Sequence, residues 1–347
     1  MTKELLDAST VLILFLQNLG SWLIVPMQWI TALGNEEFYL FVAPLIYWCL
    51  SATIGLRLGI YLMVSGLVNA GLKFVFHSPR PFWYDSRVHA LASETSFGIP
   101  SGHSQNAVVV WGALASSQRR GWGWAAAAIL TLLIGISRLV LGVHFLSDIV
   151  LGWLIGIALL WTLLLLERPF LSWYQERSTG QQILIALEIS LGLVFAAWLV
   201  RLSQSAWTVP AEWLASARLA LPGILTEPFA LSGLVSEAGA LFGLASGAIL
   251  LYPLGGFSAQ GPLWKRAVRF PIGVLVVALI WFGLGAVFPR GEYLLAYGLR
   301  YLRYALLGLW ITGGAPWLFI RLHLAQPATV GRPERQKLAT QPATVPD

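Results

Sequence analysis

The sequence predicts an all-α integral membrane protein, in which a helical bundle is followed by a second block of transmembrane helices. Of the 347 residues, 57% are hydrophobic and only 11% are charged. A soluble domain carries about 25% charged residues, so this chain has too little polar surface to cover itself in water. Many apolar stretches reach the roughly 20 residues that a helix needs to cross a bilayer. The 17 tryptophans fit belts at the two membrane interfaces.

We expect nine spanning helices, or ten if the first apolar segment also crosses. Residues 9–31 are apolar but are interrupted by polar residues and a proline, and we favour a helix that lies in the membrane interface. A change of composition near residues 170–182 separates five spans from four. The expected spans cover residues 38–54, 58–77, 102–118, 124–141, 147–166, 183–201, 234–254, 269–288 and 301–322.

These features divide the chain into four parts. Residues 1–34 form the interfacial helix or extra span, residues 35–168 a membrane core, and residues 182–324 a C-terminal transmembrane block with no role that the sequence assigns. Residues 325–347 are rich in Pro, Ala, Thr and Gln and contain QPATV twice. They lack the apolar residues for a core, so we expect a disordered tail.

The net charge of +6 indicates membrane topology and contacts with anionic lipid rather than a nucleic-acid partner. The basic residues lie mostly between apolar segments, and no basic stripe with stacked aromatics accompanies them. The connections 55–57, 119–123, 167–182 and 255–268 lie on the side richer in Lys and Arg, which should be cytoplasmic. The loops 78–101 and 142–146 then face outward. The single cysteine, Cys49, excludes an internal disulfide and a CxxC metal site.

The first of three polar clusters on the outward side contains Lys73 and Arg80. Lys73 lies near the end of a span, and Arg80 follows seven residues later. Seven residues are about two helical turns, so both cations can face one direction. Pro79 and Pro81 end the helix there. Alone, the cluster is as consistent with cations that reach the membrane interface.

The second cluster is Pro100-Ser101-Gly102-His103, directly before an apolar helix. Proline and serine suit a helix start, and Gly102 permits close approach of the backbone to a ligand. Free N–H groups and the positive end of the helix dipole favour an anion at this position. His103 would lie beside that anion. The alternative is an ordinary capped helix start with an incidental histidine.

The third cluster places Arg138 near the outward end of one span and His144 and Asp148 at the start of the next. A histidine and an aspartate four residues apart share one helix face. The carboxylate can then hold the Nδ1–H of the ring and leave Nε2 unprotonated as a nucleophile. A purely structural His–Asp pair would give the same spacing.

Alternation of the spans brings all three clusters to the same membrane face. Three cations, two histidines, one carboxylate and a helix N-terminus suit a phosphoryl group, because Arg and Lys neutralise its oxygens and stabilise charge during transfer. The sequence has no acidic cluster of the kind that holds Mg²⁺. We therefore expect metal-independent chemistry with no metal site and no cofactor.

In order and spacing, the clusters resemble the tripartite signature of the type 2 phosphatidic acid phosphatase (PAP2) superfamily. The resemblance covers about residues 30–168, which it identifies as a PAP2 catalytic core. Residues 182–347 match nothing of functional use in that signature. The matching motifs are Lys73-x6-Arg80-Pro81, Pro100-Ser101-Gly102-His103 and Ser137-Arg138-x5-His144-x3-Asp148.

The resemblance implies a role for each signature residue. His144 attacks phosphorus and forms phosphohistidine, Asp148 orients His144, and His103 protonates the leaving oxygen and then activates water. In bacterial members the site opens at the outer face of the inner membrane, the side that the charge count also indicates. The resemblance assigns phosphate binding to five further residues: Lys73, Arg80, Ser101, Gly102 and Arg138.

The leading hypothesis is therefore a lipid phosphate phosphatase of the inner membrane. The candidate substrates are phosphatidic acid, phosphatidylglycerophosphate, a polyprenyl diphosphate and a sphingoid-base phosphate. The alternative is a phosphotransferase that passes the phosphate to another lipid or sugar. A non-catalytic transporter or scramblase is disfavoured because every signature residue is present, and a vanadate haloperoxidase is disfavoured because the site lies within a membrane. The sequence does not indicate the oligomeric state.

Several polar or aromatic residues near these spans receive no catalytic role. We expect local hydrogen bonding for His77 and His89, while Glu94 is a candidate contact of His103 or of the substrate headgroup. Helix packing is the preferred explanation for the ionisable residues in the second block. The aromatics near the expected mouth are Trp83, Tyr84 and Phe97; the ionisable residues of the second block are Glu188, Arg201 and Glu237.

Overall fold

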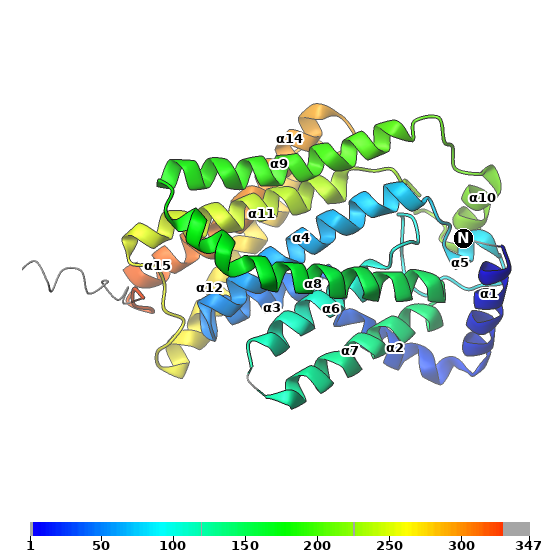
Figure 1. Cartoon of the computed structure of the whole chain (residues 1–347), viewed down its shortest axis with the longest axis horizontal. Helices are drawn as coiled ribbons and strands as arrows, with labels where there is room; N and C mark the ends of the chain where they lie inside the picture. Colours follow the sequence, from blue (N-terminus) through cyan, green and yellow to red (C-terminus); the bar gives the residue numbers. More distant parts are fainter. Residues whose placement is uncertain (1–2, 119, 225, 329–347) are drawn as a thin grey trace, which may run out of the picture.

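The computed structural model describes residues 3–118, 120–224 and 226–328, and in these residues the chain is helical, with one isolated β-bridge and no strand. Most of its helices run along the long axis of the molecule (Figure 1). The all-α prediction is therefore confirmed. The elements up to residue 175 are α1 (Lys3–Asn18), η1 (Ser21–Leu23), α2 (Ile24–Ala32), α3 (Glu36–Cys49), α4 (Ala52–Phe76), α5 (Pro81–Tyr84), α6 (Gly102–Ser116), α7 (Gly121–Val140) and α8 (Leu146–Gln175).

The second block is also helical and contains two π-helical segments, η3 and η4. Each π-helical segment continues an α-helix without a break in the chain. The elements are α9 (Thr179–Ser203), α10 (Ala211–Ala220), α11 (Ser232–Leu251), η2 (Tyr252–Leu254), α12 (Leu263–Ala278), η3 (Leu279–Leu284), α13 (Gly285–Val287), α14 (Leu294–Leu309), η4 (Trp310–Gly314) and α15 (Ala315–Arg321).

Within the described residues, six helices are long and apolar enough to cross a membrane. The chain is therefore a multi-pass membrane protein, as predicted. All nine expected segments are mainly helical, but three of them are not among these six. Two are the segments of α3 and α6, which have only 14 and 15 residues, and the third is residues 301–322. The number of nine spans therefore stays a prediction. The six spans are Ala52–Tyr84, Gly121–Val140, Leu146–Gln175, Thr179–Ser203, Ser232–Leu254 and Leu263–Val287.

The N-terminal segment bends instead of forming one long helix. The two helices Lys3–Asn18 and Ser21–Ala32 meet at 95°, which excludes a single straight span over residues 9–31. Helix α1 lies across one end of the bundle beside α5 and α10 (Figure 1), and it contacts the loop that carries the second cluster. Gln17 Nε2 donates to the backbone oxygen of His89 at 2.8 Å, and the Tyr84 hydroxyl donates to Asp7 Oδ1 at 2.6 Å.

Small residues let the principal helices pack backbone to backbone. A Cβ atom at Gly152 of α8 would lie 2.7 Å from the Ser101 carbonyl oxygen at the start of α6. In α11, a Cβ atom at Gly243 would lie 2.1 Å from the Ala305 carbonyl oxygen of α14. Close approach at small residues is a common packing mode between membrane helices. Close packing at Gly152 fixes the start of α6 against α8. It thereby fixes the two segments that carry the histidines, the start of α6 with His103 and the connection before α8 with His144.

Most of the expected disordered tail, residues 329–347, lies outside the described residues. The first part of that tail is described and is held in place. Ala325 is buried, and the Gln326 carbonyl oxygen accepts from the Ser258 backbone N–H at 3.0 Å.

Candidate active site

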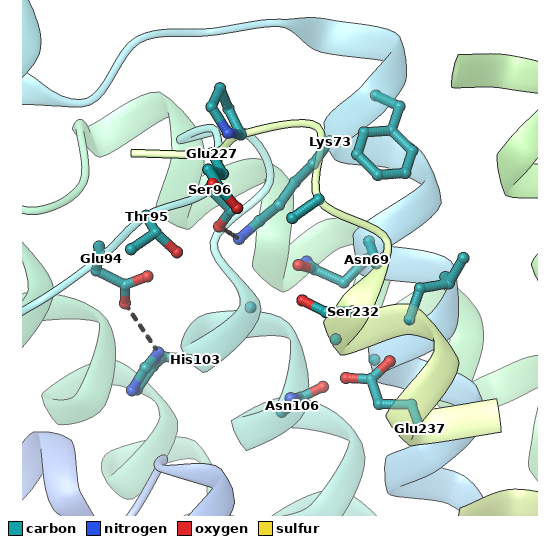
Figure 2. A pocket seen from close by; sticks show the side chains of 18 of the residues that line it. Asn69, Lys73, Glu94, Thr95, Ser96, His103, Asn106, Glu227, Ser232 and Glu237 are labelled. Atoms are coloured by element: carbon teal, nitrogen blue, oxygen red, sulfur yellow. Dashed lines mark hydrogen bonds and ion pairs between the residues drawn. The ribbon is translucent and has the colours of Figure 1, made fainter. Parts of the chain in front are cut away.

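The three predicted clusters meet at one end of the bundle, around a cavity of about 320 Å³. Lys73, Gly102, His103 and His144 line it. Figure 2 shows Lys73 and His103 entering this cavity from different elements. The other signature residues lie behind this lining and are almost completely buried: Arg80, Ser101, Arg138 and Asp148.

His144 lies in the short connection between α7 and α8, with its two ring nitrogens in different surroundings. Nδ1 is 3.2 Å from Asp148 Oδ2, and Nε2 is 3.2 Å from the Arg80 Nη1 donor. Arg80 can only donate, so the contact at Nε2 requires an unprotonated nitrogen there and a proton on Nδ1. Burial, followed by the nearby charge of Arg80, lowers the pKa of His144 well below its ordinary value. The ring is therefore neutral, with its lone pair directed at a cation.

Asp148 fixes that orientation from the first turn of α8. Its Oδ2 atom also accepts from the Phe145 backbone N–H at 3.0 Å, and its side chain is fully buried. Acidic residues are favoured in the first turn of a helix, and here the turn holds the carboxylate against the ring. The predicted His–Asp pair is therefore present with the geometry of a nucleophile and its orienting group.

Arg80 is held by a dense set of acceptors. Its Nε donates to the Ser96 carbonyl oxygen at 2.6 Å, and its Nη1 donates to the Val143 carbonyl oxygen at 3.0 Å. Nη2 donates to Glu94 Oε2 at 2.8 Å and to the Phe97 carbonyl oxygen at 3.2 Å. A planar guanidinium with five donors suits such a site. The loop and the α7–α8 connection are thereby linked through one cation.

Glu94 lies between the two arginines of the signature. One carboxylate oxygen pairs with Arg80 and the other with Arg138 Nη2, while His103 Nδ1 is 4.0 Å from Oε1. Burial raises the pKa of Glu94, but the charges of Arg80 and Arg138 outweigh that effect and hold it well below its ordinary value. The ionised carboxylate thus occupies a position where two guanidinium groups converge, as they would on phosphate oxygens.

His103, in the first turn of α6, is the more accessible of the two histidines. Its side chain is 19% exposed, against 1% for His144. Its Nε2 atom is 2.8 Å from Asn35 Oδ1. A histidine that faces the cavity and has a fixed ring can exchange a proton with a leaving group or with water.

Ser101 and Gly102 form the start of α6, and Ser101 lies at the helix start that the sequence predicted. Ser101 Oγ accepts from the Ser104 backbone N–H at 3.4 Å and is fully buried, so it acts as a helix cap. A Cβ atom at Gly102 would lie 3.2 Å from Asn69 Oδ1. The close neighbour that glycine accommodates here is therefore the Asn69 side chain. Phosphate binding by Ser101 and Gly102 stays a prediction.

Lys73 and Arg80 converge for a different reason from the one that their spacing suggested. Helix α4 ends at Phe76, and His77 follows in the left-handed region with φ 44°, so Arg80 is not two helical turns along the same helix. Both cations instead reach one hydroxyl group. Ser96 Oγ accepts from Lys73 Nζ at 2.8 Å and from Arg80 Nη2 at 3.1 Å.

The remaining sequence candidates near the site have structural surroundings. The His77 ring stacks on Trp207 at 4.6 Å between centroids, and Trp83 and Phe97 are buried in the same aromatic cluster. These rings pack beneath the loop and do not line the cavity. Sequence patterns did not identify Thr31, whose hydroxyl accepts from Arg138 Nη1 at 2.8 Å, because it comes from a distant N-terminal helix.

The arrangement suits transfer of a phosphoryl group to a histidine. At one end of the cavity, the neutral ring of His144 provides a nucleophile and His103 provides a proton carrier. The neighbouring arginines, Arg80 and Arg138, provide charge stabilisation. Among the described residues, no three His, Cys, Asp or Glu side chains come close enough together to hold a metal ion. Metal independence stays a prediction that activity in EDTA can test.

Two family models match the chain. One, described as the PAP2 superfamily, matches residues 54–171, and another, described as the PAP2 superfamily phosphatase, transmembrane extension, matches residues 235–327. The chain is 31% identical to phosphatidylglycerophosphatase B of Bacillus subtilis (strain 168) over 151 residues, which cover 40% of this chain and 72% of the relative.

Two further relatives differ in how much of the chain they cover. Undecaprenyl-diphosphatase of Sulfolobus acidocaldarius is 30% identical over 38% of this chain and 64% of its own length. Human glucose-6-phosphatase 3 is 25% identical over 61% of this chain and 69% of its own length. The crystal structure of a transmembrane PAP2 type phosphatidylglycerolphosphate phosphatase from Bacillus subtilis aligns with TM-score 0.41 and 26% identity, over 48% of this chain and 88% of that one.

Proposed function

The chain belongs to the PAP2 superfamily of phosphatases, and from that premise we propose that it dephosphorylates a membrane lipid phosphate through a phosphohistidine on His144. One observation carries the proposal. Asp148 holds Nδ1 of His144, so the lone pair lies on Nε2, where it accepts from Arg80 Nη1. Nε2 becomes the nucleophile when Arg80 donates to the phosphoryl oxygens instead. Relatives named as lipid phosphatases support the substrate class, including the phosphatidylglycerophosphatase, the undecaprenyl-diphosphatase and sphingosine-1-phosphate phosphatase 1 of Rattus norvegicus.

In the first step, His144 Nε2 attacks phosphorus as the bond from phosphorus to the leaving oxygen breaks. His103 gives its proton to that oxygen, so the alcohol leaves neutral. Lys73, Arg80 and Arg138 neutralise the phosphoryl oxygens, which requires these oxygens to share or displace the Glu94 carboxylate. Asp148 stabilises the positive charge that develops on the ring of His144.

In the second step, water attacks the phosphohistidine and the phosphorus–nitrogen bond breaks. His103, now neutral, accepts the proton from the attacking water. The reaction releases inorganic phosphate and restores His144 to its neutral form. The outward orientation of the site, at the external face of the inner membrane, belongs to this proposal and rests on the distribution of Lys and Arg between the loops.

A panel of lipid phosphates and diphosphates, assayed in EDTA with purified protein, tests the proposal. The wild type should release phosphate and should trap label as an acid-labile phosphoenzyme, whereas His144→Ala should do neither. His89→Ala, with an exposed side chain in the outward loop, is the matched control. Turnover by His144→Ala would refute the mechanism, and a labelled acceptor instead of free phosphate would indicate phosphotransfer.

Hydrolysis of a sugar phosphate is a second candidate, favoured by the extent of one match. The similarity to glucose-6-phosphatase 3 covers 61% of the chain, which is more than residues 1–168 can contain. It therefore reaches into the C-terminal block, beyond the catalytic core. Adding glucose 6-phosphate to the panel decides between a lipid and a soluble sugar phosphate.

A further inference from the structure

The cavity at the active site is built by both halves of the chain. His144, His103 and Lys73 line one part of it, and α11 of the C-terminal block contributes Ser232 and Glu237. Figure 2 shows Glu237, Ser232 and Asn106 pointing into the space below Asn69 and Lys73. The C-terminal block thus supplies polar groups to the same cavity that holds the catalytic histidines.

Glu237 reaches this position because α4 carries a glycine opposite it. A Cβ atom at Gly66 would lie 2.2 Å from Glu237 Oε1 and 2.6 Å from Oε2. The carboxylate is therefore seated against the surface of α4, in a space that any larger residue at position 66 would fill. Helix packing, the expected role of Glu237, accounts for the contact with α4 but not for the place of Glu237 in the lining of the cavity.

A carboxylate within a membrane-spanning helix is costly, and such residues usually mark a substrate or ion path. Glu237 lies in the second turn of α11, which is one of the spanning helices. A carboxylate offers about four acceptor sites on its two oxygens, so it can keep a protein partner and still accept from a ligand. Asn106 lies nearby with its own side chain fixed, since its Oδ1 accepts from Ser65 Oγ at 2.6 Å.

The two parts of the cavity differ in charge, and this difference orients a substrate. Phosphate is attracted to the part of the cavity that Lys73 lines, with Arg80 and Arg138 buried behind it, and is repelled by the carboxylate of Glu237. The group that lies next to Glu237 must instead donate hydrogen bonds, as an alcohol does. In a phosphate ester, the leaving alcohol is bonded to the phosphate. It is therefore the part of the substrate that extends from the cationic part of the cavity toward Glu237.

We propose that Glu237 and Ser232 form a hydroxyl-binding subsite for the leaving alcohol, which selects phosphate monoesters that carry a free hydroxyl beside the phosphate. This inference rests on the proposed phosphatase function. Phosphatidylglycerophosphate has such a hydroxyl on the carbon next to the phosphate. Glucose 6-phosphate carries free hydroxyls on its leaving sugar, although the adjacent carbon bears the ring oxygen. Phosphatidic acid lacks one, because the neighbouring position is an acyl ester. A site built around a hydrogen bond to a substrate hydroxyl discriminates strongly against a substrate that lacks it.

The test measures kcat/KM for phosphatidylglycerophosphate and for phosphatidic acid in the same detergent micelles. Loss of one hydrogen bond to a charged acceptor should lower the ratio of the two values about 10- to 100-fold in Glu237→Ala. Glu237→Gln keeps the shape of the side chain and should lower the ratio in the same direction by a smaller factor. Glucose 6-phosphate is a third substrate, which distinguishes a free polyol from a lipid headgroup.

Gly66→Ala tests the subsite without removing any functional group. Its Cβ atom displaces the carboxylate of Glu237, so the ratio should fall as it does in Glu237→Gln. Gly71→Ala is the matched control on the same helix, because a Cβ atom there meets only the Ala197 Cβ atom at an ordinary 3.6 Å, and its ratio should equal that of the wild type.

The outcomes separate the two proposals. Active Glu237→Gln and Gly66→Ala proteins with an unchanged ratio would overturn the subsite and leave the phosphatase function standing. A wild-type protein that hydrolyses other lipid phosphates of the panel but not phosphatidylglycerophosphate would overturn the subsite alone. A wild-type protein that hydrolyses nothing in the panel would overturn the proposed function, and the subsite with it. In these variants, an equal fall in kcat/KM for phosphatidylglycerophosphate and for phosphatidic acid would also overturn the subsite, because it would indicate a general structural effect.

Discussion

Asn in place of Asp148 should abolish most of the activity while leaving the shape of the site intact. Asparagine has the same size as aspartate, but its amide group can donate to Nδ1 of His144 and then favours the tautomer with the proton on Nε2. That tautomer has no lone pair for attack on phosphorus. The substitution also removes the negative charge that lies 3.2 Å from the ring.

The magnitude follows from that distance. Two unit charges 3.2 Å apart interact by about 5 kcal/mol at an effective dielectric constant of about 20. The positive charge develops on His144 only as the bond to phosphorus forms, so this energy acts on the transition state. Each 1.36 kcal/mol is about tenfold in rate. Because the amide dipole of asparagine retains part of the interaction, kcat should fall by roughly 10³ to 10⁴.

The assay is the rate of phosphoenzyme formation in a single turnover, with kcat and KM measured in parallel. KM should change little, since Asp148 is buried behind the cavity lining. Asp85→Asn, which removes a loop carboxylate paired with the exposed Arg87, is the matched control and should behave as the wild type. The reasoning is refuted if the Asp148→Asn enzyme forms phosphoenzyme within tenfold of the wild-type rate.

Three further substitutions test the surroundings of the nucleophile. Arg80→Lys cannot reproduce the fork of a guanidinium, so kcat/KM should fall at least 100-fold, and steady-state kinetics that show less than a tenfold loss would contradict this role. Glu94→Gln leaves Arg80 and Arg138 without their ionised partner and should cost about 3 kcal/mol of stability at pH 7. Because the pKa of Glu94 is lowered in the folded protein, the stability that Glu94 contributes is present above the ordinary pKa of about 4.3 and is lost as the pH falls. The difference in Tm between the variant and the wild type should therefore shrink at pH 3.5. Gly152→Ala places a methyl group 2.7 Å from the Ser101 carbonyl oxygen and should lower both the Tm in detergent and the activity, whereas an unchanged Tm would show that α6 and α8 can separate without cost.

Much of the site could be predicted because its chemistry is carried by local motifs. The pair His144 and Asp148 is four residues apart on one helical start, and its geometry follows from the helix repeat. The topology of the spans then brought this pair to the same end as His103, Lys73 and Arg80, as alternation requires. For His144, Asp148 and His103, a local pattern and the alternation of helix directions were sufficient.

Glu94 shows where such reasoning ends. The sequence made it a candidate contact of His103 or of the substrate headgroup, but it gave no sign that two arginines would pair with its carboxylate. Its importance comes from two arginines, 14 residues before it and 44 residues after it, whose guanidinium groups meet at its carboxylate. Lys73 and Arg80 illustrate the same limit, since they converge on Ser96 rather than along one helix.

The sequence by itself determined that this protein spans a membrane, that it is helical, and that a PAP2 signature occupies its first half. These properties depend on the local density of apolar residues and on spacings within single segments. Only the tertiary structure decided that the second half contributes to the same cavity. Glu237 and Gly66 are 171 positions apart, and their contact depends on how α11 packs against α4, a choice made by the shapes of whole helix surfaces.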